Sequence, residues 1–237
     1  MTPRSAEPLG PLPERGKAAV GAEIVKAGMT TVPLIGGTVA ELFEFVIAPS
    51  LERRRDEWLR RLGAAVDELR ERFDGFDPKN PEGNEAFVTA VLAATPIAMK
   101  TNDEDKLEML KNAVMNAAIG AMGIAEHEQL TFLRLIDELT PLHLRFLTFM
   151  TDPQGWFERT GITPPSFGMA GSPAAVLEAG LPELRGHRDV FEQLDRDLDV
   201  RGLVQGGSLF VTMTPQGAFG VRAKDLGRRF VEFVTKP

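Results

Sequence analysis

The residues of this chain best suited to acid–base catalysis or metal binding are its histidines and the carboxylates beside them. The three histidines, His127, His143 and His187, lie far apart in the sequence. The run Glu126-His127-Glu128 offers metal ligands in a row, but adjacent residues of a helix point in different directions. A solvated helix start therefore explains this run better than a metal site does.

Several sequence motifs of enzymes are absent. The chain has no Gly-x-x-x-x-Gly-Lys phosphate loop, no Gly-x-Ser-x-Gly nucleophile turn and no His-Glu-x-x-His pair. It also lacks cysteine and tyrosine, which removes a thiol nucleophile, a thiolate metal site and a common proton donor. Gly36-Gly37 and Gly206-Gly207 are more simply explained as turns. The sequence predicts a protein that is not an enzyme and has no catalytic residue, metal or cofactor.

Composition limits the classes of partner. The 237 residues are 43% hydrophobic and 26% charged, which is typical of a folded globular chain. The formal net charge of −7 disfavours non-specific attraction to nucleic acid or anionic lipid. The first residues are proline-rich without an apolar signal region, and no apolar run reaches the roughly 18–20 residues of a spanning helix. We expect a soluble cytoplasmic protein.

The N-terminal half reads as a tail followed by helices. Four prolines within residues 1–13 predict that residues 1–16 form a disordered tail. Hydrophobic periodicity then predicts a strand-free helical bundle over residues 17–125. Its longer helices are expected at Thr38–Pro49, Ser50–Phe73, Asn84–Lys100 and from Asn102 to Gly120.

The most apolar helix of this bundle, Thr38–Pro49, is the candidate interaction or membrane-facing helix. One face carries five apolar residues at helical spacing: Val39, Leu42, Phe43, Val46 and Ile47. We expect this face to pack against the two helices that follow. The run Thr38–Ala48 is about 16 Å long as a helix, roughly half a hydrocarbon core, so it cannot span a membrane. It could only lie in a membrane surface after release on activation.

The next helix, Ser50–Phe73, combines an apolar stripe that includes Trp58 and Leu62 with a highly charged opposite face. Seven arginines and six acidic residues lie between Glu52 and Arg72, so their charges almost cancel. A solvated helix face is favoured over an anion-binding patch.

The C-terminal part, residues 126–237, is predicted to be a winged helix-turn-helix-like domain with one small β-hairpin. After helix Thr140–Met150 and a structured Gly/Pro-rich loop at 151–172, the pattern predicts the following elements in order: helix Pro173–Leu184, helix His187–Val204, strand Leu209–Met213, turn Pro215-Gln216-Gly217, strand Ala218–Val221 and helix Asp225–Val234. The predicted fold class is therefore mainly α.

Most winged helices bind DNA, and the charges here argue against it. The helix that would enter the major groove, His187–Val200, has a formal charge of −3, which phosphates would repel. The segment after it is basic and is the candidate weak nucleic-acid patch: Arg201, Arg222, Lys224, Arg228 and Arg229. This patch could contact a phosphate backbone, but it does not place a reading helix in a groove.

In layout the chain resembles uncharacterised bacterial prophage- or defence-associated proteins similar to the Abi-alpha group of abortive-infection proteins. The resemblance is carried by the segments Pro33–Gly37, Ala48-Pro49, Arg53–Trp58, Leu139–Leu147 and Leu226–Phe230. The resemblance lies in the order of the predicted elements and in their residue types, over most of the chain. It implies a part in phage defence and assigns no site residues.

Two hypotheses follow. In the first, the protein is a non-enzymatic helical effector or adaptor that acts through another protein, itself, or a membrane surface on activation. In the alternative, it is a winged-helix transcriptional regulator that binds nucleic acid and dimerises through its helical half. The acidic recognition helix favours the first hypothesis, and the basic tail is the best support for the second.

Overall fold

The structure is a computed structural model that describes residues 47–73, 85–120 and 124–237. The chain divides into two units, residues 1–50 and 51–237, and the description below concerns the second. The predicted tail and nearly all of the predicted Thr38–Pro49 helix lie outside the described residues.

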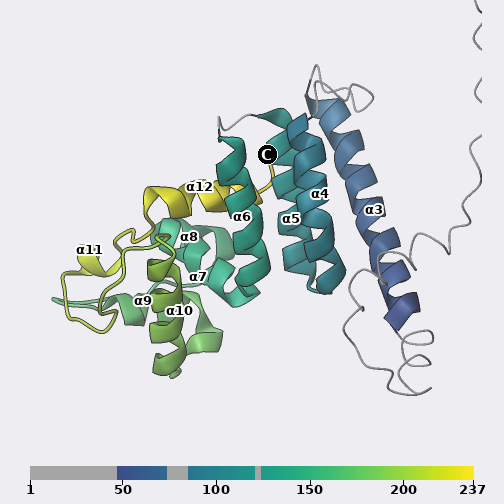
Figure 1. Ribbon diagram of the computed structural model, residues 1–237. Coiled ribbons are helices and arrows are strands. Elements are labelled where there is room, and N and C mark those ends of the chain that lie inside the picture. The colour runs from purple at the N-terminus through teal and green to yellow at the C-terminus, as the bar shows by residue number, and fades with distance from the viewer. Residues whose placement is uncertain (1–46, 74–84, 121–123) are drawn as a thin grey trace, which may run out of the picture. The chain divides into compact units, whose positions relative to one another are not determined.

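The first four helices of the described chain form its N-terminal half (Figure 1). They are α3 (Ala48–Arg72), α4 (Glu85–Lys100), α5 (Glu104–Ile119) and α6 (Glu126–Glu138). Helices α4, α5 and α6 pack against one another. The charged helix α3 contacts α4 through the buried Trp58, whose indole N–H donates to Thr95 Oγ1 at 3.0 Å. Its Ala65 and Leu69 form a second buried cluster with Met115 of α5.

Local sequence signals set several helix ends. Asp103 caps α5 by accepting a hydrogen bond from the Lys106 N–H at 2.9 Å. Gly120 ends the same helix with a φ of 55°, which glycine adopts without strain. The predicted Thr140-Pro141 start of α7 is confirmed. Ser50 is not a cap, because α3 already begins at Ala48.

The C-terminal half contains α7 (Pro141–Thr151), α8 (Pro153–Thr160), α9 (Pro173–Gly180), a 3₁₀ turn (Pro182–Leu184), α10 (Arg188–Val200), α11 (Pro215–Ala218) and α12 (Asp225–Val234). Helix α12 contacts both α5 and α7 and so joins the two halves into one core. Its Phe230 and Phe233 both stack near Phe132 of α6, with ring centroids 5.4 and 5.5 Å away. The predicted loop at 151–172 contains α8, so its first part is helical.

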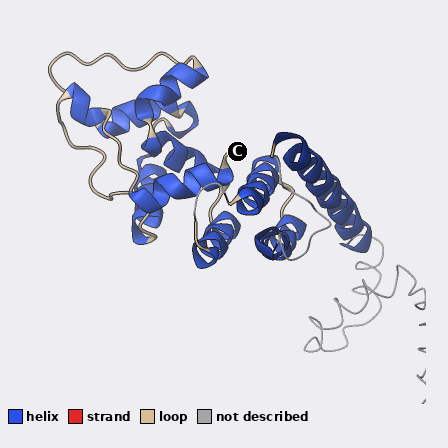
Figure 2. Cartoon of the chain, turned by 90° about the horizontal axis from the view of Figure 1, so that it is seen from above, coloured by secondary structure: helices blue, strands red, loops and turns tan. Residues whose placement is uncertain are grey.

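The predicted β-hairpin and winged helix are wrong. The described residues contain no strand, only the isolated bridges Gly171–Met213 and Val204–Ala223 (Figure 2). Thr214 caps the short helix α11 by accepting from the Gly217 N–H, so Pro215-Gln216-Gly217 starts a helix where we predicted a hairpin turn. Met213 exchanges backbone hydrogen bonds with Gly171, which takes the place of the expected partner strand.

The coarser prediction of a mainly α protein is confirmed. The helices predicted at 140–150 and 225–234 are present with nearly the predicted bounds. In the part of the chain that the structure describes, no helix is both long and apolar enough to cross a membrane.

Candidate interaction face and acidic cavity

The five residues of the predicted nucleic-acid patch all have partners within the fold. Arg201 pairs with Glu138, Lys224 with Asp199, Arg228 with Asp225 and Arg229 with Glu128, while Arg222 donates to the backbone oxygen of Gln205. Four of the five cations therefore lie beside a carboxylate. This pairing lowers the positive potential that a phosphate backbone would meet.

The predicted interaction helix is represented by one residue. Val39, Leu42, Phe43 and Val46 lie outside the described residues, and Ile47 is 39% exposed. The prediction that this face is buried or membrane-facing remains a prediction.

The histidines do not converge. His143 belongs to a capping box at the start of α7, and its other ring nitrogen, Nε2, lies 3.3 Å from Asp197 Oδ2 of α10. His127 and His187 lie near the starts of α6 and α10. No three histidine or carboxylate side chains of the described segments are placed to hold a metal ion.

An apolar strip is exposed along α3 and α4. Leu59 of α3 is 55% exposed, and Val88 and Leu92 of α4 are 45% and 69% exposed. Val88 and Leu92 lie one turn apart on the same face of α4. The Trp58–Thr95 hydrogen bond joins the two helices; Leu59 follows Trp58 in the sequence, and Leu92 lies three residues before Thr95. Three large apolar residues are therefore exposed on two helices that the Trp58–Thr95 hydrogen bond joins.

The outer surface of α3 continues this strip with small and charged residues. Arg60, Gly63, Ala64 and Asp67 recur at spacings of three and four, on the side of the helix opposite the buried Trp58. A methyl group added at Gly63 would meet no atom within 4 Å. We call Leu59, Gly63, Ala64, Val88 and Leu92, together with the charged residues flanking them on α3, the α3–α4 face.

A second candidate is an acidic cavity between α10 and the loop that follows it. It has a volume of about 310 Å³ and is lined by Glu192, Asp195, Arg196 and Asp199 of α10 and by residues 206–210. The four α10 residues share one helix face, because they are spaced at i, i+3, i+4 and i+7. Such a cavity lies at the small end of the roughly 300–1,000 Å³ range of small-molecule sites.

Asp195 is the buried member of this cavity. It is only 6% exposed, its Oδ2 accepts the Gly207 N–H at 3.4 Å, and its Oδ1 is buried without a hydrogen-bond partner. Burial raises the pKa of Asp195 above its ordinary value, and the nearby Asp199 carboxylate adds to this, although Arg222 and the Gly207 N–H oppose it.

Asp199 is in a different environment. Its Oδ1 accepts hydrogen bonds from Lys224 Nζ and from the Gly206 N–H, both at 3.1 Å. These two donors hold the pKa of Asp199 below its ordinary value, the lysine contributing more. The helix therefore carries one carboxylate fixed as an anion and one buried carboxylate with a free oxygen.

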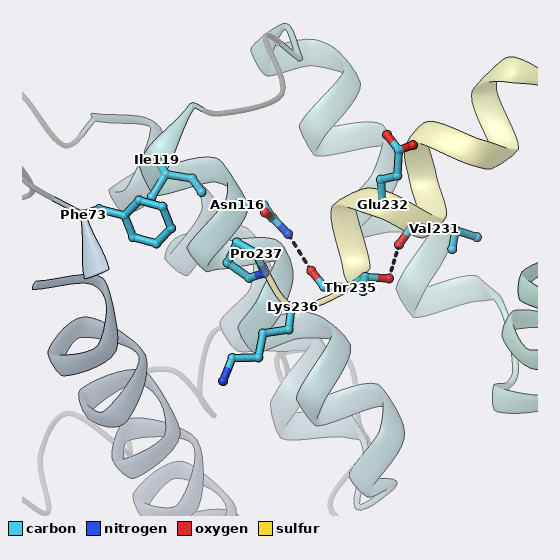
Figure 3. A pocket seen from close by; sticks show the side chains of 8 residues that line it. All are labelled: Phe73, Asn116, Ile119, Val231, Glu232, Thr235, Lys236 and Pro237. Atoms are coloured by element: carbon cyan, nitrogen blue, oxygen red, sulfur yellow. Dashed lines mark hydrogen bonds between the residues drawn. The ribbon is translucent and has the colours of Figure 1, made fainter. Parts of the chain in front are cut away.

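A second cavity, of about 440 Å³, lies where the ends of α3, α5 and α12 meet (Figure 3). Asn116 points toward the end of α12, where its side-chain amide donates to the backbone oxygens of Phe233 and Thr235 at 2.8 and 2.9 Å. Lys236 is paired with Glu68 of α3 at 2.8 Å. The polar side chains Asn116 and Lys236 of this cavity are therefore already bonded within the protein. They leave few polar groups with which the cavity could recognise a ligand.

Comparison of the chain with protein-family models, with curated proteins and with solved structures finds no match. The resemblance to the Abi-alpha group therefore remains an expectation.

Sequence reasoning passed over both candidate sites, although it had a signal for each. Asp195 follows Phe191 and precedes Leu198 on the buried stripe of α10, so its position predicts burial despite its charge. Leu59 stands among charged residues of α3, away from the Trp58 stripe. Each residue departs from its local pattern, and such departures are typical of functional positions.

Proposed function

We propose that this protein is a non-catalytic helical interaction protein, and that the occupant of its α3–α4 face is a second copy of the same chain. The observation that carries the proposal is the exposure of Leu59, Val88 and Leu92 on neighbouring helices. Scattered apolar residues are ordinary on protein surfaces, but a gathered apolar strip with a charged rim is typical of interaction sites. The resemblance to abortive-infection proteins supports phage defence as the biological setting.

Charge complementarity selects a second copy as the partner. If two α3 helices pack antiparallel about a two-fold axis between Gly63 and Ala64, Arg60 of each chain faces Asp67 of the other. This pairing joins opposite charges and occurs twice, as a two-fold axis requires. Among the described residues Asp67 has no ion-pair partner, so its charge is available for this contact.

The centre of this arrangement suits close helix packing. Gly63 and Ala64, the 16th and 17th of the 25 residues of α3, are small and exposed. A glycine in a helix interior costs roughly 0.8–1.0 kcal/mol relative to alanine, and no contact in the described fold requires Gly63. Close approach of a second helix supplies a reason for glycine at this position.

The proposal is tested by analytical ultracentrifugation of the full chain over a concentration series. We expect a monomer–dimer equilibrium for the unmodified chain and a shift to monomer for the double variant Leu59→Lys, Leu92→Lys. Val200→Lys is the matched control, because Val200 is 80% exposed on α10, outside the α3–α4 face, and should leave the dimer unchanged.

A charge exchange tests the register. Arg60→Glu and Asp67→Arg should each weaken the dimer, since each places like charges together across the axis, and the double variant should restore it. A chain that remains monomeric at every concentration would refute the proposal. A dimer unaffected by either set of variants would place the interface elsewhere.

The alternative of a winged-helix regulator is not proposed. Its structural premise, the hairpin wing, is absent from the described residues. Its basic residues are paired within the fold, as described above.

A further inference from the structure

We infer that residues 235–237, which follow α12, form a strap that fastens the last turns of α3 to α5. Release of this strap opens the end of α3 while the rest of the fold stays folded. The inference goes beyond the proposed self-association, because the strap contacts α3 at Glu68 and Arg72, and neither residue takes part in the proposed pairing between two copies. It concerns a single copy of the chain and is tested on the monomer.

The strap is held on its inner side by two buried asparagines of α5. Asn112 and Asn116 are each 5% exposed. The Asn112 side-chain amide donates to the Val234 backbone oxygen at 3.1 Å, and that of Asn116 donates to the Thr235 backbone oxygen at 2.9 Å. A buried hydrogen bond is costly to break, because its donor would be left without a partner. The strap therefore begins from a fixed point on the core.

On its outer side the strap is bonded to two charged residues of α3. Lys236 Nζ lies 2.8 Å from Glu68 Oε1. Arg72 donates to the same carboxylate oxygen at 2.8 Å and, through its other terminal nitrogen, to the Pro237 backbone oxygen at 2.7 Å. Lys236 and, to a smaller extent, Arg72 hold the pKa of Glu68 below its ordinary value. The Lys236 side chain is 57% exposed, so these surface bonds are weak and sensitive to salt.

The end of α3 has little other attachment to the core. Only four of the 25 residues of α3 are buried, against eight of the 16 residues of α5. Two of these four, Ala65 and Leu69, pack with Met115 in a small cluster separate from the main hydrophobic core. The cavity of about 440 Å³ is lined by the strap and by Phe73 and Ile119, which pack against this cluster (Figure 3). Atoms that face a cavity lack packing partners there, so opening this end of α3 breaks few contacts.

The earlier turns of α3 are attached more firmly. Trp58 and Leu62 belong to the main hydrophobic core, and the Trp58 indole is bonded to Thr95 of α4. Parts of a protein that bury few contacts open at a lower free energy than the core does. An opening that starts at Arg72 therefore stops before Leu62, and only the last turns of α3 depend on the strap.

Backbone amide hydrogen exchange tests the strap, measured by mass spectrometry on the full chain at concentrations where it is monomeric. Lys236→Gln removes the charge of the strap and should speed exchange in residues 66–72 about two- to fivefold, the factor expected for a surface ion pair. Glu68→Gln removes the acceptor of both Lys236 and Arg72 and should speed this exchange further. Exchange in α5 should not change.

Two matched variants separate the strap from general effects of charge. Lys236→Arg keeps the positive charge and should exchange as slowly as the unmodified chain. Lys224→Gln removes a comparable exposed pair, with Asp199 at 3.1 Å, and should leave exchange in α3 unchanged. Salt at about 1 M, where the Debye length is about 3 Å, should speed exchange of the unmodified chain more than that of Lys236→Gln.

Three results would overturn the inference. The first is unchanged exchange in residues 66–72 for both Lys236→Gln and Glu68→Gln, which would show that other contacts hold the end of α3. The second is equal acceleration in α3 and α5, which would show that the strap stabilises the whole fold. The third is equal acceleration by Lys224→Gln, which would indicate an effect of net charge. None of these results depends on whether the chain dimerises, so the strap and the proposed self-association can fail separately.

Discussion

Trp58 joins the outer helix α3 to the rest of the fold, and its truncation should strongly destabilise the protein. The side chain has no exposed surface, and its indole N–H donates to Thr95 Oγ1 at 3.0 Å. Thr95 Oγ1 in turn donates to the Val91 backbone oxygen at 2.7 Å. Two consecutive hydrogen bonds therefore connect Trp58 to the backbone of α4. Trp58→Ala removes a fully buried aromatic side chain from the core and leaves a cavity.

The expected loss in unfolding free energy is about 3–5 kcal/mol, the range for a buried aromatic residue cut to alanine. Trp58→Phe keeps a large apolar ring and loses chiefly the hydrogen bond, which is worth about 1 kcal/mol. Thr95→Val removes the acceptor from the other side, so a double-mutant cycle with Trp58→Phe isolates the energy of the bond.

The assay is urea denaturation followed by circular dichroism and by the fluorescence of Trp156, the other tryptophan of the chain. Trp156 donates to the Gly180 backbone oxygen and therefore reports on the C-terminal half. Parallel losses by both signals would show that α3 unfolds cooperatively with the core. A loss below about 1 kcal/mol for Trp58→Ala would refute the packing of α3 against α4 and the α3–α4 face that depends on it.

Three further predictions concern other parts of the fold. Asn116→Ala should cost about 1–3 kcal/mol in urea denaturation, because two backbone oxygens at the end of α12 lose their donor; a loss within measurement error would contradict this. Gly63→Ala should stabilise the protein by roughly 0.5–1 kcal/mol at concentrations where it is monomeric, and a destabilised monomer would show that the site is crowded. Because burial raises the pKa of Asp195 in the folded state, the ionised side chain opposes folding, and stability falls as pH rises through that pKa. Asp195→Asn should therefore gain stability relative to the unmodified chain as pH rises above about 4, the ordinary pKa of an aspartate, and a difference independent of pH would be inconsistent with this burial.

The helices of this fold could be predicted from sequence because their signals are local. Thr140-Pro141 starts α7, and Gly120 ends α5, as capping chemistry predicts. The prediction of a hairpin failed because the sequence Thr214-Pro215 suits the start of a helix as well as a turn. The choice between them depends on backbone pairing of Met213 with Gly171, more than forty residues away, which no local pattern reveals.

The candidate sites could be predicted only in part. The burial of Asp195 follows from its place on the apolar stripe of α10, whereas its free oxygen depends on the path of a loop. The basic patch looked available because several of its partners are distant in sequence: Arg229 pairs with Glu128, and Arg201 with Glu138. Local charge counts therefore overstated its positive potential.

Self-association through the α3–α4 face is tested most directly by disulfide trapping with Ala64→Cys. The natural chain has no cysteine, so any covalent dimer must join two copies at position 64. A disulfide requires Cα atoms about 4.4–6.8 Å apart, which a two-fold axis between Gly63 and Ala64 allows. Mild oxidation should convert Ala64→Cys almost fully to a covalent dimer, while Val200→Cys, although more exposed than most positions, should remain monomeric. Equal and slow cross-linking of the two variants would reflect random collision and would contradict the proposed interface.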